Sequence, residues 1–298
     1  IKFFSENIRL GIAPINWSND DMHEVGGYYS LDTILSEMNQ AGYEGTEIGN
    51  KFPSNAKEIK ITLEKYDLEL ASSWHSTFFL TNSFKEESEN IKNKCSLLSE
   101  AGARVVNIAE CSGSIHNKIK TALHFKPVCN EDHYSILSDS LNKAGEICNS
   151  FGLNLSFHHH MGTYIQNYDE IEKILSMTDP RLVNLCADTG HLYFAGADPI
   201  DFFQKHIDRV KHIHFKDVRH DLFNKINFKE ESFLSLVLKG IFTVPGDGCI
   251  DFAKIAKTIK DSKYKGWIIV EAEQDPKIAN PLDYAVLSKN YLDKIWSS

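Results

Sequence analysis

Short apolar runs alternate with longer segments of helical periodicity along the whole chain. Such an alternation is typical of βα units, in which each helix returns the chain so that successive strands lie parallel in one sheet. We count eight apolar runs and predict a β-strand in each. They span residues 8–14, 43–49, 68–74, 104–110, 153–159, 182–188, 210–216 and 267–273.

Helical periodicity is clearest in four of the segments that separate or follow these runs. These segments are 31–42, 85–102, 134–152 and 281–296. Three of them end in a glycine, at Gly42, Gly102 and Gly152. Glycine adopts at little cost the left-handed backbone conformation that terminates many helices. We therefore predict that these three helices end at their glycines, just before the next strand.

Eight strands that alternate with helices predict an α/β protein with the (β/α)8 TIM-barrel fold. An open, doubly wound sheet is the alternative, but neither G-x-G-x-x-G nor G-x-x-x-x-G-K-[ST] follows the first strand. No linker rich in Pro, Gly or Ser divides the chain, so we predict a single domain over residues 1–298. The segment 218–252 is too long for an ordinary βα loop, and we interpret it as an extended loop after the seventh strand that could act as a lid.

Charge and composition exclude several classes of protein. A net charge of −9 would repel a phosphate backbone, so we expect no nucleic acid as a partner. The six cysteines contain no C-x-x-C pair, which favours free thiols in a reducing compartment. No apolar run reaches the roughly 18 residues of a membrane span, and the start, IKFFSENIRLG, lacks the apolar core of a secretory signal. We expect a soluble, cytoplasmic protein with no membrane contact.

Strand periodicity predicts which side chains face the barrel axis, because alternate residues of a strand point to opposite faces. In the last four strands one parity is apolar and should pack on the helices: Leu153, Leu155, Phe157, Val183, Leu185, Ala187, Ile213, Phe215, Ile268, Val270 and Ala272. The other parity should point inward: Asn154, Ser156, His158, His160, Asn184, Cys186, Asp188, His212, His214, Lys216, Trp267, Ile269, Glu271 and Glu273. Most ionisable groups of these strands therefore belong to the inward set.

Four inward groups, His158, Asp188, His214 and Glu271, stand at the carboxyl ends of consecutive strands. Active sites of TIM barrels lie at this end of the barrel. Unpaired buried charge is costly, so two imidazoles and two carboxylates at one mouth need mutual compensation or a cation. Mixed nitrogen and oxygen ligands suit Mn²⁺, Co²⁺, Mg²⁺ or Zn²⁺ better than a thiophilic metal. The sequence predicts a divalent metal site made by these four side chains.

Several nearby residues have a structural interpretation as well as a functional one. A single strand-end His or Asp is more often a satisfied polar residue than a ligand. His160 shares the face of His158 and could touch substrate, whereas His159 should point toward the helices. Lys216 could be a plain counter-ion, Glu273 could reach solvent, and His212 lies deeper and is structural in our interpretation. We expect Trp17, Trp74 and Phe52 in the core rather than as stacking platforms.

Several motifs together resemble the myo-inosose-2 dehydratase family of the inositol catabolic pathway. They are GIAPINWSNDDM (11–22), EMNQAGYEGTEIGNKFP (37–53), FHHHMGT (157–163), CADTGHLYFAG (186–196), HIHFKDV (212–218) and VEAEQDP (270–276). The match runs through nearly the whole chain. The wider superfamily of xylose-isomerase-like barrels shares only D-T-G-H, H-x-H-x-K-D and the glutamate of the eighth strand, so the longer motifs are the specific ones.

The resemblance implies a xylose-isomerase-like TIM barrel that holds Mn²⁺ or Co²⁺ and removes water from 2-keto-myo-inositol (scyllo-inosose) to give a trihydroxycyclohexane-1,2-dione. In the superfamily the metal ligands are usually Glu, Asp, His and Glu, in chain order. The corresponding residues here are His158, Asp188, His214 and Glu271, so His158 stands where relatives often have Glu. His191, in D-T-G-H, would line the site. Family members have been associated with glutathione, although no segment here marks a thiol-binding pocket. Barrels of the superfamily often form dimers or tetramers, which allows a homo-oligomer.

This chemistry makes a small-molecule polyhydroxy ketone the expected partner. A base must take a proton from the carbon beside the carbonyl, an enediolate must be stabilised, and the hydroxyl on the next carbon must be protonated as it leaves. Our candidates for proton transfer are Lys216, His160 and Glu273, in that order. Candidates for hydrogen bonds to ring hydroxyls are the loop residues Asn16, Trp17, Glu47, Asn50 and Lys51, together with His191.

Three other functions remain as alternatives. A metal-dependent ketose epimerase or isomerase uses the same enediolate but returns the proton. A nuclease on the same fold needs a basic groove, which the acidic charge disfavours. A binding module without activity is disfavoured because all four ligand candidates are present.

Overall fold

The computed structural model describes residues 7–297, and in it eight parallel strands close into a barrel. Around the barrel the strands follow the order β1-β10-β7-β6-β5-β4-β3-β2, so neighbours in the chain are neighbours in the sheet. The strands are β1 (Ile8–Ile12), β2 (Gly45–Ile48), β3 (Glu69–Thr77), β4 (Val105–Glu110), β5 (Asn154–His158), β6 (Val183–Asp188), β7 (Val210–Phe215) and β10 (Gly266–Val270). The structure confirms the eight predicted strands and the TIM barrel, and closure excludes the open sheet.

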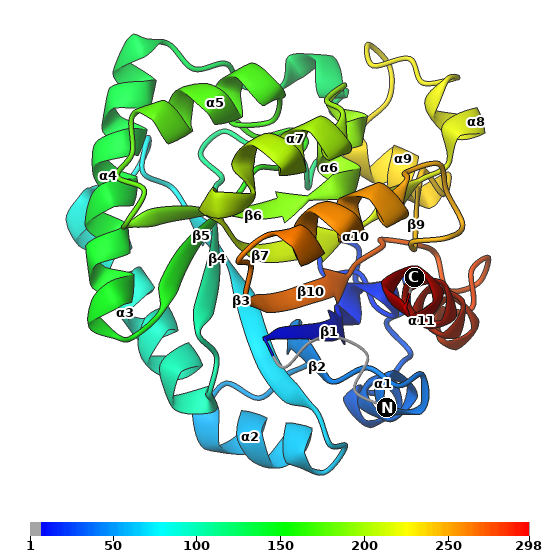
Figure 1. Cartoon of the computed structure of the whole chain (residues 1–298). Coiled ribbons are helices and arrows are strands. Elements are labelled where there is room, and N and C mark those ends of the chain that lie inside the picture. Colours follow the sequence, from blue (N-terminus) through cyan, green and yellow to red (C-terminus); the bar gives the residue numbers. More distant parts are fainter. Residues whose placement is uncertain (1–6, 298) are drawn as a thin grey trace.

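Helices form a ring around the barrel (Figure 1). They are α1 (Leu31–Gln40), α2 (Ala56–Glu64), α3 (Phe84–Ala101), α4 (Glu131–Ser150), α5 (Tyr168–Ser176), α6 (Thr189–Phe194), α7 (Pro199–His206), α10 (Phe252–Asp261) and α11 (Pro281–Ser297), with short 3-10 turns at Pro14–Asn16, Leu123–Phe125 and Ile207–Arg209. The predicted glycine ends are confirmed, because Gly42, Gly102 and Gly152 have φ of 88°, 101° and 72°. Among the described residues, no helix is long and apolar enough to cross a membrane.

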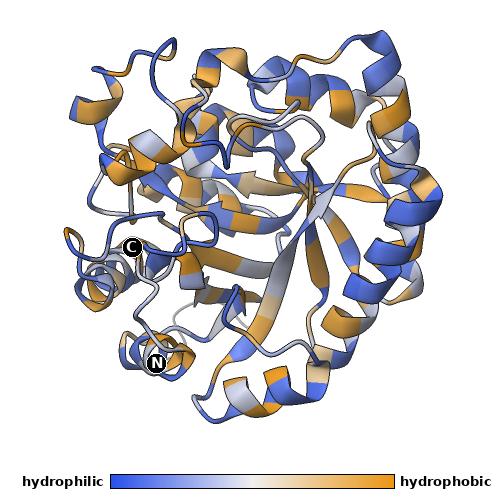
Figure 2. Ribbon diagram, turned by 180° about the vertical axis from the view of Figure 1, so that it is seen from behind, coloured by the Kyte–Doolittle hydropathy of each residue, from blue (hydrophilic) through white to orange (hydrophobic). Residues whose placement is uncertain are grey.

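The predicted parity of the strands is also confirmed. Phe215 of β7 points outward and packs on Phe252 of α10, with ring centroids 4.9 Å apart. Ile269 of β10 points inward and forms a small cluster with Ala13 and Ala71 at the barrel axis. Apolar residues therefore fill the layer between sheet and helices and part of the barrel interior. The helices turn their hydrophobic faces toward the barrel (Figure 2).

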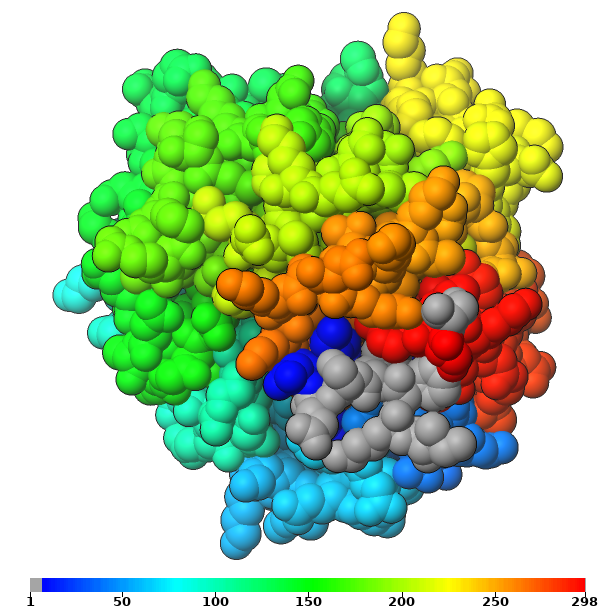
Figure 3. Space-filling model, in the orientation of Figure 1, coloured from blue at the N-terminus to red at the C-terminus, as the bar shows by residue number. Residues whose placement is uncertain are grey.

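The segment 218–252 has secondary structure of its own, whereas the sequence suggested an extended loop. Strand β8 (Asp217–Val218) pairs antiparallel with β9 (Phe242–Thr243), and two short helices, α8 (His220–Phe223) and α9 (Phe233–Leu238), lie between them. This insertion occupies one corner of the molecule beside α10 (Figures 1 and 3). Its core is apolar, since Phe233, Leu234, Leu236, Val237 and Phe242 are buried. The lid function stays a prediction.

The carboxylate of Asp217 holds the returning arm of this insertion. Its Oδ1 accepts hydrogen bonds from the backbone N–H groups of Val218 (2.8 Å) and Ile250 (3.0 Å), and its Oδ2 accepts from that of Gly248 (3.1 Å). The arm is thereby tied to the end of β7. The insertion is attached beside the strand end that carries His214 and Lys216.

All six cysteines are free, as predicted.

Candidate metal centre and active site

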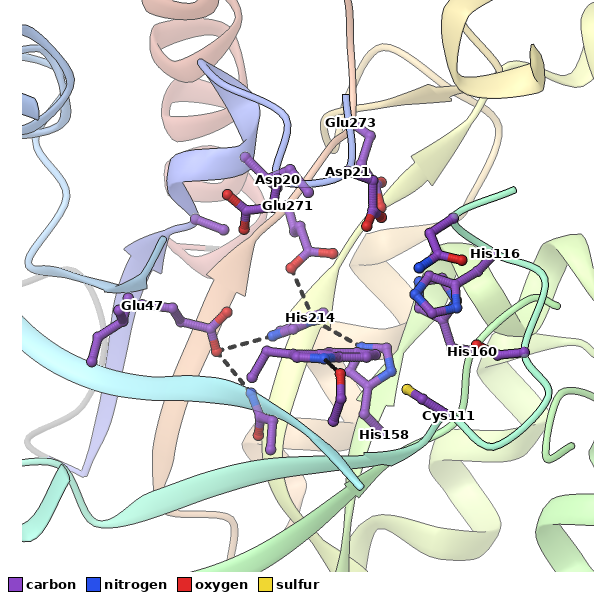
Figure 4. Close-up of a pocket in the computed structure, with 18 of the residues that line it drawn as sticks. Asp20, Asp21, Glu47, Cys111, His116, His158, His160, His214, Glu271 and Glu273 are labelled. Atoms are coloured by element: carbon purple, nitrogen blue, oxygen red, sulfur yellow. Dashed lines mark hydrogen bonds and ion pairs between the residues drawn. The ribbon is translucent and has the colours of Figure 1, made fainter. Parts of the chain in front are cut away.

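Four side chains predicted as ligands lie at the carboxyl ends of β5, β6, β7 and β10, and Figure 4 shows three of them, His158, His214 and Glu271. His158 Nε2 lies 3.2 Å from His214 Nδ1 and 3.7 Å from Asp188 Oδ2. His214 Nδ1 also lies 3.6 Å from Asp188 Oδ2 and 3.2 Å from Glu271 Oε2. One atom each of Asp188, His214 and Glu271 falls within 4.8 Å of the others. The four residues therefore lie close together, and His214 approaches each of the other three.

Hydrogen bonding determines which nitrogen of His214 faces the other three residues. His214 Nε2 lies 3.1 Å from Glu47 Oε1, a carboxylate oxygen that can only accept. Nε2 therefore carries a proton, and Nδ1 is the nitrogen that faces two carboxylate oxygens and the second imidazole. Asp188 Oδ2, which faces His158 and His214, is buried without a hydrogen-bond partner. Lone pairs that face one another in a buried site repel unless a positive charge lies between them.

The charges around these four residues also favour a cation. Glu47, Asp188, Glu271 and Glu273 contribute four carboxyl groups, and Lys216 contributes one ammonium group. Burial lowers the pKa of His214, but Cys186, Glu271 and Glu47 raise it, and the net pKa lies well above its ordinary value. Without an ion, the acidic surroundings of His214 therefore favour a second proton on Nδ1, and a bound cation would take the place of that proton.

The donor set fits a divalent metal ion. Ligands at about 2.0–2.2 Å from a shared ion lie about 2.8–3.6 Å apart at tetrahedral or octahedral angles. The separations of His214 Nδ1 from the three other facing atoms, 3.2–3.6 Å, lie in this range, and that of His158 from Asp188, 3.7 Å, is close to it. Two imidazole nitrogens and two carboxylate oxygens suit Mn²⁺, Co²⁺ or Zn²⁺.

A second group of side chains lies beside the first and is centred on His160. His160 Nδ1 lies 2.8 Å from the carbonyl oxygen of Met161, which can only accept, so Nδ1 carries the proton and Nε2 keeps a basic lone pair. Burial is the largest of the causes that lower the pKa of His160 well below its ordinary value. One atom each of His160, His191 and Glu273 lies within 4.8 Å of the others. A neutral imidazole and a carboxyl group are therefore adjacent.

Lys216 is fully buried beneath the two glutamates of the eighth barrel strand. Its Nζ lies 2.7 Å from Glu271 Oε1 and 2.8 Å from Glu273 Oε2. Burial lowers the pKa of Lys216, but Asp188, Glu271 and Glu273 raise it, so that the net pKa lies above its ordinary value. The side chain is a counter-ion that holds two carboxylates, and it is not among the residues that line the cavity described below.

Gly190, in the D-T-G-H motif, makes room for Lys216. A Cβ atom at this position would lie 2.5–2.8 Å from the Cβ, Cγ and Cδ atoms of Lys216. We expect Gly190→Ala to lower the free energy of unfolding by about 1–2 kcal/mol, because the cost of overpacking exceeds the gain of about 1 kcal/mol in helix propensity. Urea denaturation followed by circular dichroism measures this change. Unaltered stability would contradict the close packing of Gly190 on Lys216.

A cavity of about 330 Å³ opens above the two groups. It is lined by Ala13, Pro14, Ile15, Asp20, Asp21, Glu47, Ile48, Trp74, Ser76, Phe78, Asn107, Cys111, Ser114, His116, Asn117, His158, His160, His214, Glu271 and Glu273. Trp74 was expected in the core, but it forms part of the wall, with its ring 5.1 Å from that of His158 and 5.5 Å from that of His160. The tryptophan gains this position because β3 extends to Thr77, beyond the predicted end of the strand.

Of the residues predicted to bind ring hydroxyls, Glu47 lines the cavity. Asn16 donates its amide to the carbonyls of Ala13 and Val270, and the indole of Trp17 donates to Glu37, so both side chains are engaged within the protein. Lys51 donates to the carbonyls of Gly27 and Tyr29 and supports the loop that follows β1.

Two further predicted residues lie beside the site without lining the cavity. Asn50 is exposed, and its backbone N–H donates to Asp20 Oδ1 over 3.2 Å. His191 is buried, accepts at Nδ1 from the backbone N–H of Met161, and has its ring centroid 3.9 Å from that of His160. These two residues contact groups that do reach the cavity.

The sequence predictions missed the part of the cavity that loops provide. Asp20 and Asp21 come from the loop after β1, and Cys111, Ser114, His116 and Asn117 come from the loop after β4. Burial is the largest of the causes that raise the pKa of Asp20 to about 6. The only sequence signal for these residues is their position after strand ends, where barrel sites lie.

Comparison with known proteins gives a consistent result for the whole chain. The family model for the xylose isomerase-like TIM barrel matches residues 35–295. An inosose dehydratase of Geobacillus thermodenitrificans is 44% identical over 291 residues, which cover 97% of this chain and 98% of that protein. An inosose dehydratase of Clostridium beijerinckii is 43% identical over 294 residues, with 97% of each chain covered.

Solved structures agree on the fold. The IolI protein, solved with a bound zinc atom, superposes with a TM-score of 0.69, and the match covers 97% of this chain and 98% of that one. The two sequences are 14% identical, so this likeness concerns the barrel architecture alone.

Proposed function

Because the chain belongs to the inosose dehydratase family of xylose isomerase-like TIM barrels, we propose that it removes water from 2-keto-myo-inositol to give a trihydroxycyclohexane-1,2-dione in inositol catabolism. This reaction makes it a hydro-lyase. The observation that carries the proposal is the adjacency of two groups: a donor set for a divalent ion, of which His158, His214 and Glu271 line the cavity, and a neutral His160 with a free Nε2 in the same cavity.

In this proposal His158, Asp188, His214 and Glu271 hold the ion, which is Mn²⁺ or Co²⁺. When bound, a divalent ion acts as a Lewis acid toward the oxygens of the substrate and stabilises the negative charge that develops on them. The four side chains come from the ends of four neighbouring strands, which are rigid supports. We assign no residue to glutathione.

His160 is the base that takes the proton from the carbon beside the carbonyl. Its Nδ1–H donates to the carbonyl of Met161, so Nε2 is the nitrogen available to accept the proton. The side chain lines the cavity, and aromatic rings of Trp74, Phe233 and His191 surround it and exclude water from its faces. Loss of the proton from the substrate leaves an enediolate.

Glu273 supplies the proton to the departing hydroxyl, because burial, the largest of the causes that act on it, raises its pKa to about 7 and so favours the protonated acid. Elimination acts on two adjacent ring carbons, so the groups that take and give the proton must lie close together. His160 and Glu273 meet this requirement, since they offer atoms within 4.8 Å of each other. Lys216, which was our first candidate for the base, takes the role of positioning Glu271 and Glu273 by its ion pairs of 2.7 and 2.8 Å.

Polar residues of the loops complete the substrate site. Asp20, Asp21, His116 and Asn117 line the cavity beyond the ion-binding group, and carboxylates accept hydrogen bonds well from the hydroxyl groups of a polyol. We assign them to the ring hydroxyls of the substrate, in place of Asn16, Trp17 and Lys51.

The proposal is tested by incubating the purified protein with 2-keto-myo-inositol and MnCl2 in deuterated water. We expect the ultraviolet absorbance of a conjugated dione to rise, and a protein stripped with a chelator to lose this activity and regain it with Mn²⁺. An epimerase would exchange the proton beside the carbonyl for deuterium without producing the absorbance. Exchange without absorbance, or neither signal, would overturn the dehydratase proposal.

A further inference from the structure

One oxygen of Glu47 receives three N–H donors in the barrel interior. Glu47 Oε1 accepts from Asn107 Nδ2 at 2.9 Å, from His212 Nε2 at 2.7 Å and from His214 Nε2 at 3.1 Å. Glu47 lies on β2, Asn107 on β4, and the two histidines on β7. The carboxylate therefore links three strands across the barrel axis, and Figure 4 shows its contact with His214.

This contact fixes both the tautomer and the ring orientation of His214. With Nε2–H donating to the carboxylate, Nδ1 is the only nitrogen that can serve as a ligand, and it faces the point shared with Asp188 and Glu271. His158 differs in this respect. Its Nδ1 is buried without a hydrogen-bond partner, so of the two imidazoles only that of His214 has a carboxylate behind it.

We propose that Glu47 is a positioning residue of the metal centre, which acts on the ion through His214 rather than by touching it. This inference rests on the proposed function, because it presumes that His214 binds the ion. A carboxylate behind a ligating imidazole raises the basicity of the ligand and holds its ring in place. The role goes beyond the contact with ring hydroxyls that the sequence suggested for Glu47.

Asn107 and His212 have a part in this arrangement. Their two hydrogen bonds to Oε1 hold the carboxylate in the orientation in which the same oxygen meets His214. Glu47 is buried, with 6% of its surface exposed, and a buried carboxylate without such donors would be costly. The two neutral donors compensate this burial without cancelling the negative charge that acts on His214.

The test compares Mn²⁺ binding by the wild-type protein, Glu47→Gln and Glu47→Ala, by calorimetry on metal-free protein. We expect Kd to rise by about 10-fold for Glu47→Gln, which keeps an acceptor but loses the charge, and by up to about 100-fold for Glu47→Ala. Glu44→Gln is the matched control. It removes the same charge just before the same strand, at the opposite end, where Glu44 pairs with Arg9, and it should bind Mn²⁺ as the wild type does.

A spectroscopic measurement separates positioning from a merely structural role. In protein labelled with 15N-histidine and loaded with diamagnetic Zn²⁺, we expect His214 to carry its proton on Nε2, and the signal to be altered in Glu47→Ala. The signal is assigned by its absence in His214→Gln. Thermal denaturation of the metal-free variants shows whether they are folded. If Glu47→Ala does not fold, the comparison is made with Glu47→Gln, whose side chain has nearly the same shape as that of glutamate.

The outcomes distinguish the two proposals. If the wild-type protein binds no divalent ion, the metal centre is wrong and this inference fails with it. If the wild type binds Mn²⁺ and folded Glu47 variants bind it within threefold of the same Kd, the dehydratase proposal stands and the positioning role is overturned. A raised KM for substrate with unchanged Kd for Mn²⁺ would also overturn it, since Glu47 would then contact substrate alone.

Discussion

Replacement of Asp188 by asparagine is expected to abolish tight Mn²⁺ binding and to lower kcat/KM by about 10³-fold or more. A Lewis acid is worth several kcal/mol in the transition state, and each 1.4 kcal/mol or so is a factor of ten in rate. The two oxygens of Asp188 have separate roles. Oδ1 caps α6 by accepting from the backbone N–H of His191 at 2.8 Å, and Oδ2 faces His158 and His214. Asparagine keeps the capping oxygen and removes the charged one.

The control for this substitution is Asp198→Asn. Asp198 caps α7 in the same manner, accepting from the backbone N–H of Ile200 at 2.8 Å, but it does not belong to the group of candidate ligands around His214. Calorimetry with MnCl2 and the dehydration assay are run on both variants. If Asp188→Asn and Asp198→Asn bind the ion and turn over substrate equally well, Asp188 is not a ligand.

Replacement of His160 by asparagine is expected to lower kcat by about 10²- to 10⁴-fold, the usual contribution of general acid–base catalysis. The amide nitrogen of asparagine can take the place of Nδ1 and keep the hydrogen bond to the carbonyl of Met161, which is 2.8 Å long in the wild type. The basic Nε2 has no counterpart in this variant. Mn²⁺ affinity should not change, because the expected loss lies in proton transfer and not in binding of the ion.

Proton exchange gives the direct measurement for His160. We expect His160→Asn to lose the exchange of the substrate proton beside the carbonyl with deuterated water, as well as the formation of product. His116→Asn is the comparison variant, since His116 lines the same cavity with its ring centroid 5.0 Å from that of His160. Because His116 is assigned to a ring hydroxyl, this variant should have a raised KM, while the exchange persists. A kcat for His160→Asn within tenfold of the wild type, together with a large loss in Glu273→Gln, would transfer the role of base to Glu273.

Much of the fold could be predicted because its signals are local. The left-handed ends at Gly42 and Gly102 require only the properties of glycine, and the outward direction of Phe215 requires only that strand residues alternate. The insertion at 218–252 was harder. Its two strands have two residues each, and periodicity is not detectable over so short a length.

The candidate ligands could also be predicted, because parallel strands of a closed barrel end at the same rim. Asp188 and His214 each stand at the end of a strand with the correct parity, so their convergence required no knowledge of loops. The loop residues followed no such rule. Asp20 and His116 line the cavity, while Trp17 and Lys51 do not, because loop conformation depends on hydrogen bonds such as those from Lys51 to two backbone carbonyls.

The eight strands, their inward faces and the four groups at one rim could be inferred from the order of residues alone, because period and parity are properties of neighbouring residues. The chemical role open to each group depends instead on contacts between distant parts of the chain. Which nitrogen of His214 faces the other candidate ligands depends on Glu47, which lies 167 residues away in the chain. The burial of Lys216 depends on its ion pairs with Glu271 and Glu273, which follow β10. Such hydrogen bonds and ion pairs join residues that only barrel closure brings together. They determine which atoms carry protons and which side chains reach the cavity, and a local sequence pattern contains no information on either.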